Sequence, residues 1–288
     1  MRTYLECIPC FVRQALDAAR LATSDLAVHE RVLRETLRWA SEMSFDQSPP
    51  SMGQRIHRLL REVSENPDPY RDAKRQANEV AMGWLPNLRE RIGAAPDPLA
   101  AAMRVAIAGN IIDLGCRTEV SEEEIRAAIT RAFADPLAPE AVADFREALR
   151  SASRILYLAD NAGEIVLDRL LVEQLPLERV TLAVRGGPVI NDATRADADL
   201  VGLTSLVKVV DNGSDAPGTI LEDCSPAFRE LFERADLLIA KGQGNYETLS
   251  EAGRNIYFLL QAKCPVIARD IGCTVGKAVL RHARGAVG

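Results

Sequence analysis

The sequence is poor in cysteine and has no long apolar run, and each shortage excludes a class of protein. Six cysteines occur in 288 residues, so the chain is not a small secreted domain held together by a disulfide framework. No stretch of about 18 or more uninterrupted apolar residues is present, which argues against a transmembrane helix. The first residues also lack the apolar core of a signal peptide. We therefore expect a cytoplasmic protein without a membrane partner.

The charge balance is mildly acidic. Thirty-five basic and 41 acidic residues give a net charge of −6. Such a balance does not favour a broad nucleic-acid-binding surface, although it is compatible with a local basic pocket. With 47% hydrophobic and 26% charged residues, the composition is that of a soluble globular protein with one large or two modest domains. These numbers carry no prediction of oligomeric state.

Residues 1–150 are expected to form a helical N-terminal region, because apolar residues recur there at helical spacing. Proline pairs near residues 49 and 67 interrupt the pattern, and Ser121 is a candidate helix cap. The expected helices cover residues 11–21, 28–43, 52–63, 72–84, 98–112, a segment opening at 121, and 139–151.

From residue 154 the pattern changes to short, nearly continuous apolar runs. Such runs are typical of strands covered on both faces, and hence of a parallel sheet. We expect strands at 155–158, 180–184, 206–210, 237–240 and 265–268, with crossover helices at 165–174, 194–201, 226–234 and 248–260. The predicted fold class is α/β: a Rossmann-like three-layer αβα sandwich with a mostly parallel sheet over residues 151–288, preceded by the α-helical part.

Two acid–amide pairs follow the first two expected strands. Asp160 and Asn161 come directly after the first, and Asn191 and Asp192 follow the second. The carboxyl ends of parallel strands are where ligands bind in such sheets, and oxygen donors of this kind suit hard divalent cations. Asp and Asn are also favoured N-caps, so each pair alone has a simpler explanation as a helix cap. Together they predict a metal site built from Asp160, Asn161 and Asp192.

Two lysines extend this prediction toward phosphate chemistry. Lys241 ends the fourth apolar run, and Lys263 precedes the fifth. Lysine acts as a point charge toward phosphate, and a metal ion with a lysine can offset the charge of a phosphoryl transition state. The simpler reading of Lys263 is a solvated cation at a helix end. Neither GxGxxG nor GxxxxGK[ST] follows the first strand, so the dinucleotide fingerprint and the Walker loop are missing.

Cys7 and Cys10 form a CxxC motif that opens the chain. A thioredoxin-like motif would follow a strand within a βαβ unit, whereas this one precedes a helical pattern. A structural zinc site normally has four ligands, and no second CxxC or nearby histidine pair is available. We therefore expect a structural or accessory metal role for the pair, with catalytic use as the minority interpretation.

The ordered set of motifs resembles that of the damage-control metal-dependent phosphatases. The motifs are those at residues 160–164, 189–194, 241–247 and 263–264, with the segment 108–113 as a further match. The start of the chain, residues 4–10, is similar to the stand-alone prokaryotic branch of that family. The resemblance extends over essentially the whole chain, and the combination is far more specific than any one motif.

The resemblance implies a function and a set of site residues. It implies hydrolysis of phosphate monoesters of small metabolites, including sugar phosphates, with Mn²⁺ or Ni²⁺ as cofactor and Co²⁺ or Mg²⁺ as alternatives. The implied metal ligands are again Asp160, Asn161 and Asp192, and the implied catalytic residues are Asp192 and Lys263. The implied substrate contacts are Asn110, Gln243, Gly244, Asn245, Glu247 and Lys263. Cys7 and Cys10 belong to the characteristic residues of that branch.

Two other functions stay open at this point. Some relatives have been described as carboxyl methyltransferases, and a Rossmann-like sheet permits binding of S-adenosylmethionine, although fold does not decide function. A methyltransferase usually has a glycine-rich loop after its first strand, and residues 160–163 offer one glycine. The second alternative is a non-enzymatic metal- or redox-responsive binding protein built around Cys7 and Cys10.

Overall fold

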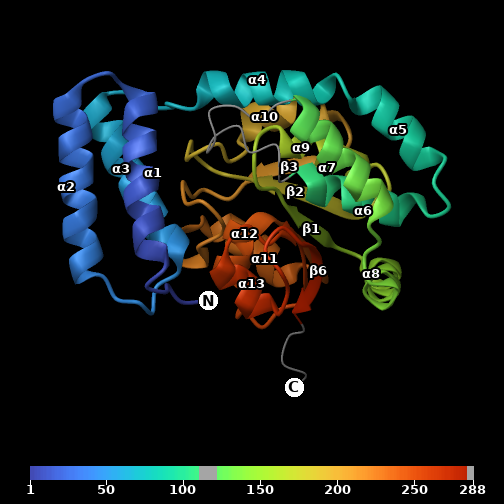
Figure 1. Ribbon diagram of the computed structural model, residues 1–288. Helices are drawn as coiled ribbons and strands as arrows, with labels where there is room; N and C mark the ends of the chain where they lie inside the picture. The colour runs from blue at the N-terminus through green and yellow to red at the C-terminus, as the bar shows by residue number, and fades with distance from the viewer. Residues whose placement is uncertain (110–121, 284–288) are drawn as a thin grey trace.

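The computed structural model describes residues 1–109 and 122–283, and a six-stranded sheet lies at its centre (Figure 1). The strand order is β3-β2-β1-β4-β5-β6, with β1 to β5 parallel and β6 antiparallel to β5. Strand order reverses between β1 and β4, as in Rossmann folds, so the predicted fold class is confirmed. The strands are β1 (Ile155–Leu158), β2 (Val180–Val184), β3 (Lys208–Asp211), β4 (Leu237–Lys241), β5 (Ile256–Gln261) and β6 (Ala278–Ala283).

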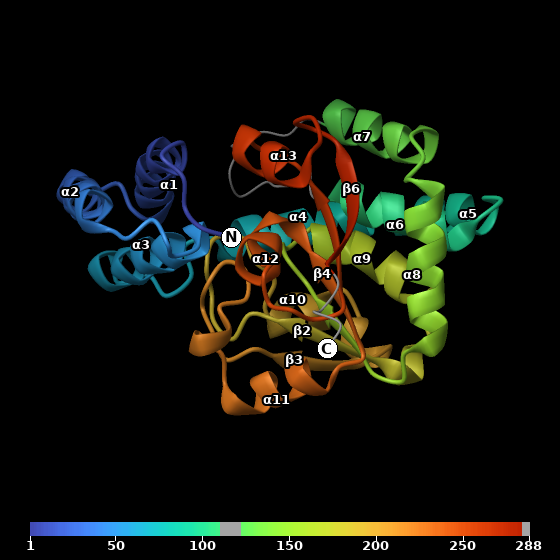
Figure 2. The same ribbon diagram turned by 90° about the horizontal axis from the view of Figure 1, so that it is seen from below.

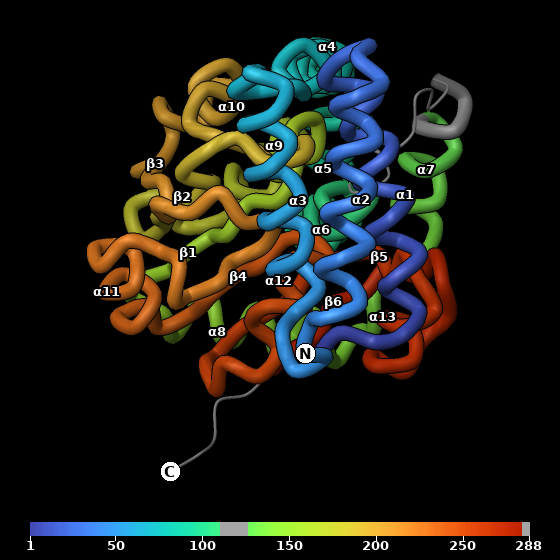
Figure 3. The backbone as a smooth tube through the Cα atoms, turned by 90° about the vertical axis from the view of Figure 1, so that its left-hand side faces the viewer, coloured from blue at the N-terminus to red at the C-terminus, as the bar shows by residue number. Residues whose placement is uncertain are grey.

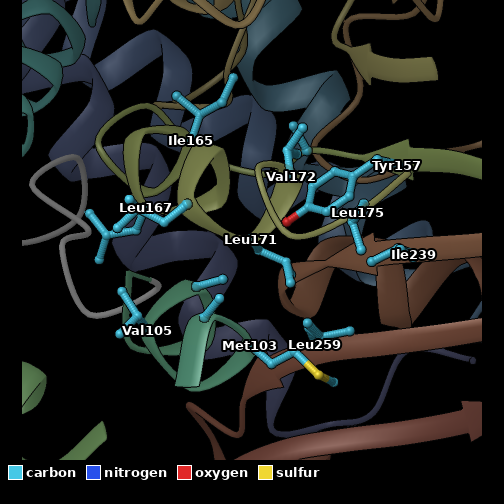
Figure 4. Close-up of a cluster of buried hydrophobic side chains, with 14 of the residues drawn as sticks. Met103, Val105, Tyr157, Ile165, Leu167, Leu171, Val172, Leu175, Ile239 and Leu259 are labelled. Carbon is cyan, nitrogen blue, oxygen red and sulfur yellow. The ribbon is translucent and has the colours of Figure 1, made fainter. Parts of the chain in front are cut away.

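Helices cover both faces of the sheet. On one face, Tyr157, Ile239 and Leu259 pack against α6 (Pro98–Ala108) and α9 (Glu164–Val172) (Figure 4). Alternate strand residues point to the other face and pack against three further helices. These are α11 (Pro226–Arg234), α12 (Gly242–Leu249) and α13 (Pro265–Ile271). Burial on both faces explains why the central strands are continuously apolar.

The N-terminal helices fall into two groups. The first three helices stand beside the sheet and pack around a small core, to which Tyr70, Val189 and Ile190 also contribute (Figures 2 and 3). The later helices share the large core of the sheet, so packing runs across residue 150, and the division expected there stays a prediction. The helices are α1 (Cys7–Ala22), α2 (Leu26–Glu42), α3 (Pro49–Ser64), α4 (Arg71–Met82), α5 (Leu85–Gly93), α7 (Glu122–Ala134), α8 (Pro139–Ser151) and α10 (Arg195–Leu200).

The fifth strand differs from the sequence prediction. Residues 265–268 belong to the helix α13, and Pro265 occupies its first turn, where its missing N–H costs nothing. The strand is β5, which the prediction had assigned to the end of a helix over 248–260. A short apolar run fits a buried strand or a buried helix equally well, which explains the error. The helix α5 and the edge strand β6 were not predicted.

The described residues also bear on membrane insertion. Among their helices, none combines the length and apolar character that crossing a bilayer would require.

Candidate active site

Backbone hydrogen bonds tie the loops after β1 and β2 to each other. The amide of Ala193 donates to the carbonyl of Asp160 at 2.7 Å, and Asn161 and Asp192 form an antiparallel bridge. Asp160 and Asn161 are each 7% exposed and Asp192 is 3% exposed. The structure thus brings the three expected metal ligands together at the carboxyl edge of the sheet.

Arg185, to which the sequence analysis assigned no role, joins the two aspartates. Its Nε donates to Asp192 Oδ2 at 2.6 Å, and its Nη2 lies 3.5 Å from Asp160 Oδ1. The arginine directly follows β2 and is itself buried. Its position at the end of an apolar run was the available signal, because the carboxyl ends of the strands converge on the site.

The carboxyl of Asp160 lies in strongly acidic surroundings. Burial, with Glu164 and Asp192 as further causes, raises its pKa well above the usual value, while Arg185 and Lys263 act in the opposite direction. Burial and the neighbouring carboxylates together outweigh the nearby cations, and an added positive charge would stabilise the ionised form.

Lys241 is not available to a substrate, contrary to the sequence prediction. Its Nζ donates to Glu164 Oε1 at 2.6 Å, to the carbonyl of Ala106 at 3.0 Å and to Asp168. The lysine and both carboxylates are 0% exposed. The two carboxylates hold the pKa of the ammonium above its ordinary value despite burial. Lys241 is an internal counter-ion whose position at the end of β4 resembles that of Arg185 at the end of β2.

The buried network has an excess of negative charge that fits a divalent cation. Four carboxylates, from Asp160, Glu164, Asp168 and Asp192, share two cations, from Arg185 and Lys241, which leaves a formal charge of −2 when all are ionised. Oxygen donors of carboxylates and amides suit hard cations. Within the described ranges no three His, Cys, Asp or Glu side chains gather closely enough to hold a metal ion, so a site here needs the amide of Asn161 as a donor.

Lys263 lies on the connection between β5 and α13 and is exposed. It follows the fifth strand, whereas the sequence analysis had placed it before that strand. Its charge acts to lower the pKa of Asp160. Lys263 therefore lies at the carboxyl edge of the sheet, where its charge reaches the expected metal ligand Asp160.

The loop and first turn of α12 divide into structural and pocket-facing residues. Asn245 is 0% exposed; its amide donates to the carbonyls of Ala159 and Lys241, and its oxygen accepts from Thr219. These bonds favour a structural role over the expected substrate contact. A pocket is instead lined by Gln243, Gly244 and Glu247.

The pocket has a volume of about 550 Å³ and lies between the N-terminal helices and α12. One wall is formed by α1 and α3, including Arg13, Gln14 and Asp17, and the other by the loop after β2 and by α12. Glu247 accepts a hydrogen bond from Gln243 at 2.8 Å, and burial raises the pKa of its carboxyl to about 7.

Ile190 connects the pocket to the aspartate loop. This β-branched residue lines the pocket and has a φ of 44°, a conformation that such residues rarely adopt. Strain of this kind is found where surrounding contacts fix a functional loop.

The loop after β1 is held by a side chain of α4. The amide of Gly163 in this loop donates to Asn78 Oδ1 at 2.7 Å. Nothing in the sequence pointed to Asn78, because only packing brings α4 to this edge.

The two remaining expectations are Asn110 and the cysteine pair. Asn110 lies outside the described residues. Cys7 and Cys10 are free thiols in the first turn of α1, and burial raises the pKa of both. Cys10 lines the pocket, while Cys264, beside Lys263, lies 3.9 Å from the Gln243 amide nitrogen. The expected role of the pair stays a prediction.

Fold and site together define a Rossmann-like α/β protein with an acidic cluster at the sheet's carboxyl edge and a pocket beside it. A family model described as the damage-control phosphatase ARMT1-like domain matches residues 3–279. The chain belongs to this family, and the resemblance seen in its motifs is confirmed.

Individual relatives support the same assignment. A protein named damage-control phosphatase from Archaeoglobus fulgidus is 36% identical over 96% of this chain and 97% of its own length. An uncharacterised protein from Methanocaldococcus jannaschii is 37% identical over 96% of this chain and 93% of its own. The crystal structure of a DUF89 family protein from Pyrococcus horikoshii superposes with a TM-score of 0.87 at 31% identity, covering 99% of this chain and 100% of that one.

Proposed function

We propose that the protein is a metal-dependent phosphatase that hydrolyses phosphate monoesters of small, damaged metabolites. The observation that carries the proposal is the buried network at the sheet edge, whose carboxylates exceed its cations by two formal charges. Membership of the damage-control phosphatase family supports the same reaction.

Asp160, Asn161 and Asp192 would hold the cation, with Mn²⁺ or Ni²⁺ as the first candidates and Co²⁺ or Mg²⁺ as alternatives. A bound divalent cation supplies Lewis-acid stabilisation of charge on phosphoryl oxygens. Arg185 fixes the two aspartates through the contacts at 2.6 and 3.5 Å.

Lys263 contributes a positive charge at the rim of the site. Its exposed ammonium can meet the phosphate of an entering substrate and neutralise part of its charge. A donor that stabilises the phosphoryl group more in the transition state than in the ground state raises kcat.

The pocket beside α12 would take the leaving group of the ester. A volume of about 550 Å³ lies in the range of small-molecule sites. Its rigid proline and aromatic walls suit a ring, and Arg13, Gln14 and Asp17 offer polar partners to hydroxyl groups. Sugar phosphates are therefore the substrate class that we propose.

A metal-screened phosphatase assay tests the proposal. Metal-stripped protein is supplied with Mn²⁺, Ni²⁺, Co²⁺ or Mg²⁺ and assayed on p-nitrophenyl phosphate and on a panel of hexose and pentose phosphates. Release of phosphate that requires added metal and is abolished by chelator is the expected result. Equal hydrolysis with chelator present would overturn the metal dependence. Absence of hydrolysis, with thermal protection by S-adenosylmethionine, would favour the methyltransferase alternative.

A further inference from the structure

The side chain of Asn161 has a defined orientation in the buried network. Its amide nitrogen donates to Asp160 Oδ2 at 2.9 Å and to Glu164 Oε2 at 3.3 Å. If the amide were rotated by 180°, its oxygen would face two carboxylate oxygens, and neither contact could be a hydrogen bond. The two carboxylates therefore direct the nitrogen inward and leave the oxygen of Asn161 for a cation.

Glu164 is held in place by a second interaction that does not involve the metal site. Its Oε1 accepts from Lys241 Nζ at 2.6 Å, while Oε2 faces Asn161. Lys241 is fixed in turn by the carbonyl of Ala106 at 3.0 Å and by Asp168. All three charged side chains are 0% exposed, so the carboxylate of Glu164 has little freedom to turn away.

We infer that Glu164, anchored by Lys241, is a positioning residue that orients the Asn161 amide as a metal ligand. Glu164 is not a catalytic residue, because its two oxygens face Lys241 and Asn161. The inference rests on the proposed function, since it needs a cation at Asp160, Asn161 and Asp192. Outer partners that orient a ligand typically change metal affinity by roughly tenfold to a hundredfold when they are removed.

The pair Glu164 and Asp168 provides a matched comparison. Both carboxylates are buried and both accept from Lys241, but Glu164 in addition accepts from the Asn161 amide at 3.3 Å. Each variant removes one negative charge from the network, so an effect of charge alone predicts the same loss of metal affinity in Glu164→Gln and Asp168→Asn. A positioning role predicts a clearly larger loss in Glu164→Gln.

The test measures Mn²⁺ binding to the full chain by electron paramagnetic resonance titration, with thermal unfolding followed in parallel. In Glu164→Gln the single acceptor pairs with Lys241 and the new NH₂ group faces Asn161. The expected result is a loss of Mn²⁺ affinity of roughly tenfold to a hundredfold. Asp168→Asn, which loses the same formal charge but keeps the contact between Glu164 and Asn161, should lose clearly less Mn²⁺ affinity than Glu164→Gln.

Glu164→Asp covers the case in which the first variant does not fold. It keeps the charge for Lys241 but withdraws the carboxylate from Asn161 by one methylene, so the same loss of affinity is expected. Wild-type affinity in a folded Glu164→Gln or Glu164→Asp variant, or an equal loss of affinity in Asp168→Asn, would overturn the inference. Absence of Mn²⁺ binding by the wild-type protein would instead overturn the proposed metal site, so the two failures are distinguishable.

Discussion

Gly242 lies so close to the carboxylate of Asp160 that a Cβ atom at this position would stand 1.8 Å from Asp160 Oδ2. Its φ of +77° is also in the region that favours glycine. Two independent constraints, one steric and one conformational, thus require glycine where β4 gives way to α12. The first turn of α12 can approach the aspartate only because the side chain is missing.

Replacement of Gly242 by alanine should therefore displace Asp160. We expect Gly242→Ala to lose metal-dependent hydrolysis and to lower the melting temperature, because the backbone or the carboxylate must move. Gly93→Ala is the matched control, since its added Cβ would meet no atom within 4 Å and alanine is the better helix former. An active Gly242→Ala variant would contradict the close approach.

Asp192→Asn should abolish Mn²⁺ binding and hydrolysis while the protein stays folded. Asparagine keeps an oxygen that can accept from Arg185, but it removes the charge that a cation needs. Asp192→Ala should in addition destabilise the protein by about 3 kcal/mol, because it deprives a buried guanidinium of the nearer of its two carboxylates. Metal titration and thermal unfolding of both variants separate the two effects. Retained hydrolysis in Asp192→Asn would remove the basis of the proposed site.

Lys263→Ala should lower kcat/KM by a factor on the order of a hundred, comparable to the loss of one oxyanion donor. Affinity for Mn²⁺ should change little, because the lysine is not a proposed ligand. Steady-state kinetics on p-nitrophenyl phosphate, with the metal titrated separately, measure both quantities. Lys208→Ala, which removes an exposed lysine from the opposite end of the sheet, serves as control. Wild-type kinetics in Lys263→Ala would leave the lysine a solvated surface cation.

Arg13→Ala should change the choice of substrate more than the chemistry. Arg13 lines the pocket from α1 and is exposed, so its loss would remove a charged hydrogen-bond donor to the leaving group. Such a bond contributes about 1.5–3 kcal/mol, and kcat/KM for hexose phosphates should fall by roughly tenfold or more. The value for p-nitrophenyl phosphate, which lacks hydroxyl groups, should stay nearly constant. An equal fall for both substrates would assign Arg13 to the reaction centre or to folding.

Acid should destabilise the protein through His57, which lies buried in α3 and bonds to the carbonyl of Gly53 at 2.9 Å. Burial lowers its pKa from 6.5 to about 4. Between these two values the unfolded chain binds a proton that the folded chain does not, so stability falls as pH drops from 6.5 to 4. The full effect is about 3 kcal/mol.

Thermal unfolding across this pH range tests the role of His57. The melting temperature of His57→Gln should depend less on pH than that of the wild type. Equal pH dependence in the two proteins would exclude His57 as the source.

Each strand can be recognised from its own short stretch of sequence, and the ends of parallel strands meet at one edge of the sheet. The sequence was therefore sufficient to place Asp160, Asn161 and Asp192 in one site. The sequence could not show whether a lysine or arginine at the end of a strand points into the protein or toward solvent. Lys241 and Arg185 both follow apolar runs, yet both point into the protein, and this depends on carboxylates from other elements. The contact of Asn78 with the loop after β1 could not be predicted for the same reason, because it depends on how α4 packs against the sheet. The error over β5 arose because its apolar run carries no periodicity that separates strand from helix.

The two walls of the pocket come from different parts of the chain, which meet at Ile190 of the loop after β2. The wall formed by α1 and α3 belongs to the small N-terminal core, whereas Gln243 and Glu247 belong to the sheet. Gln14 on α1 takes no part in the hydrogen bonds described for the carboxylate network, so its exchange is expected to leave that network in place. We expect proteins of this architecture that act on different substrates to differ mainly in the residues of the helical wall. The residues of the sheet edge, which would carry out the reaction, should stay the same.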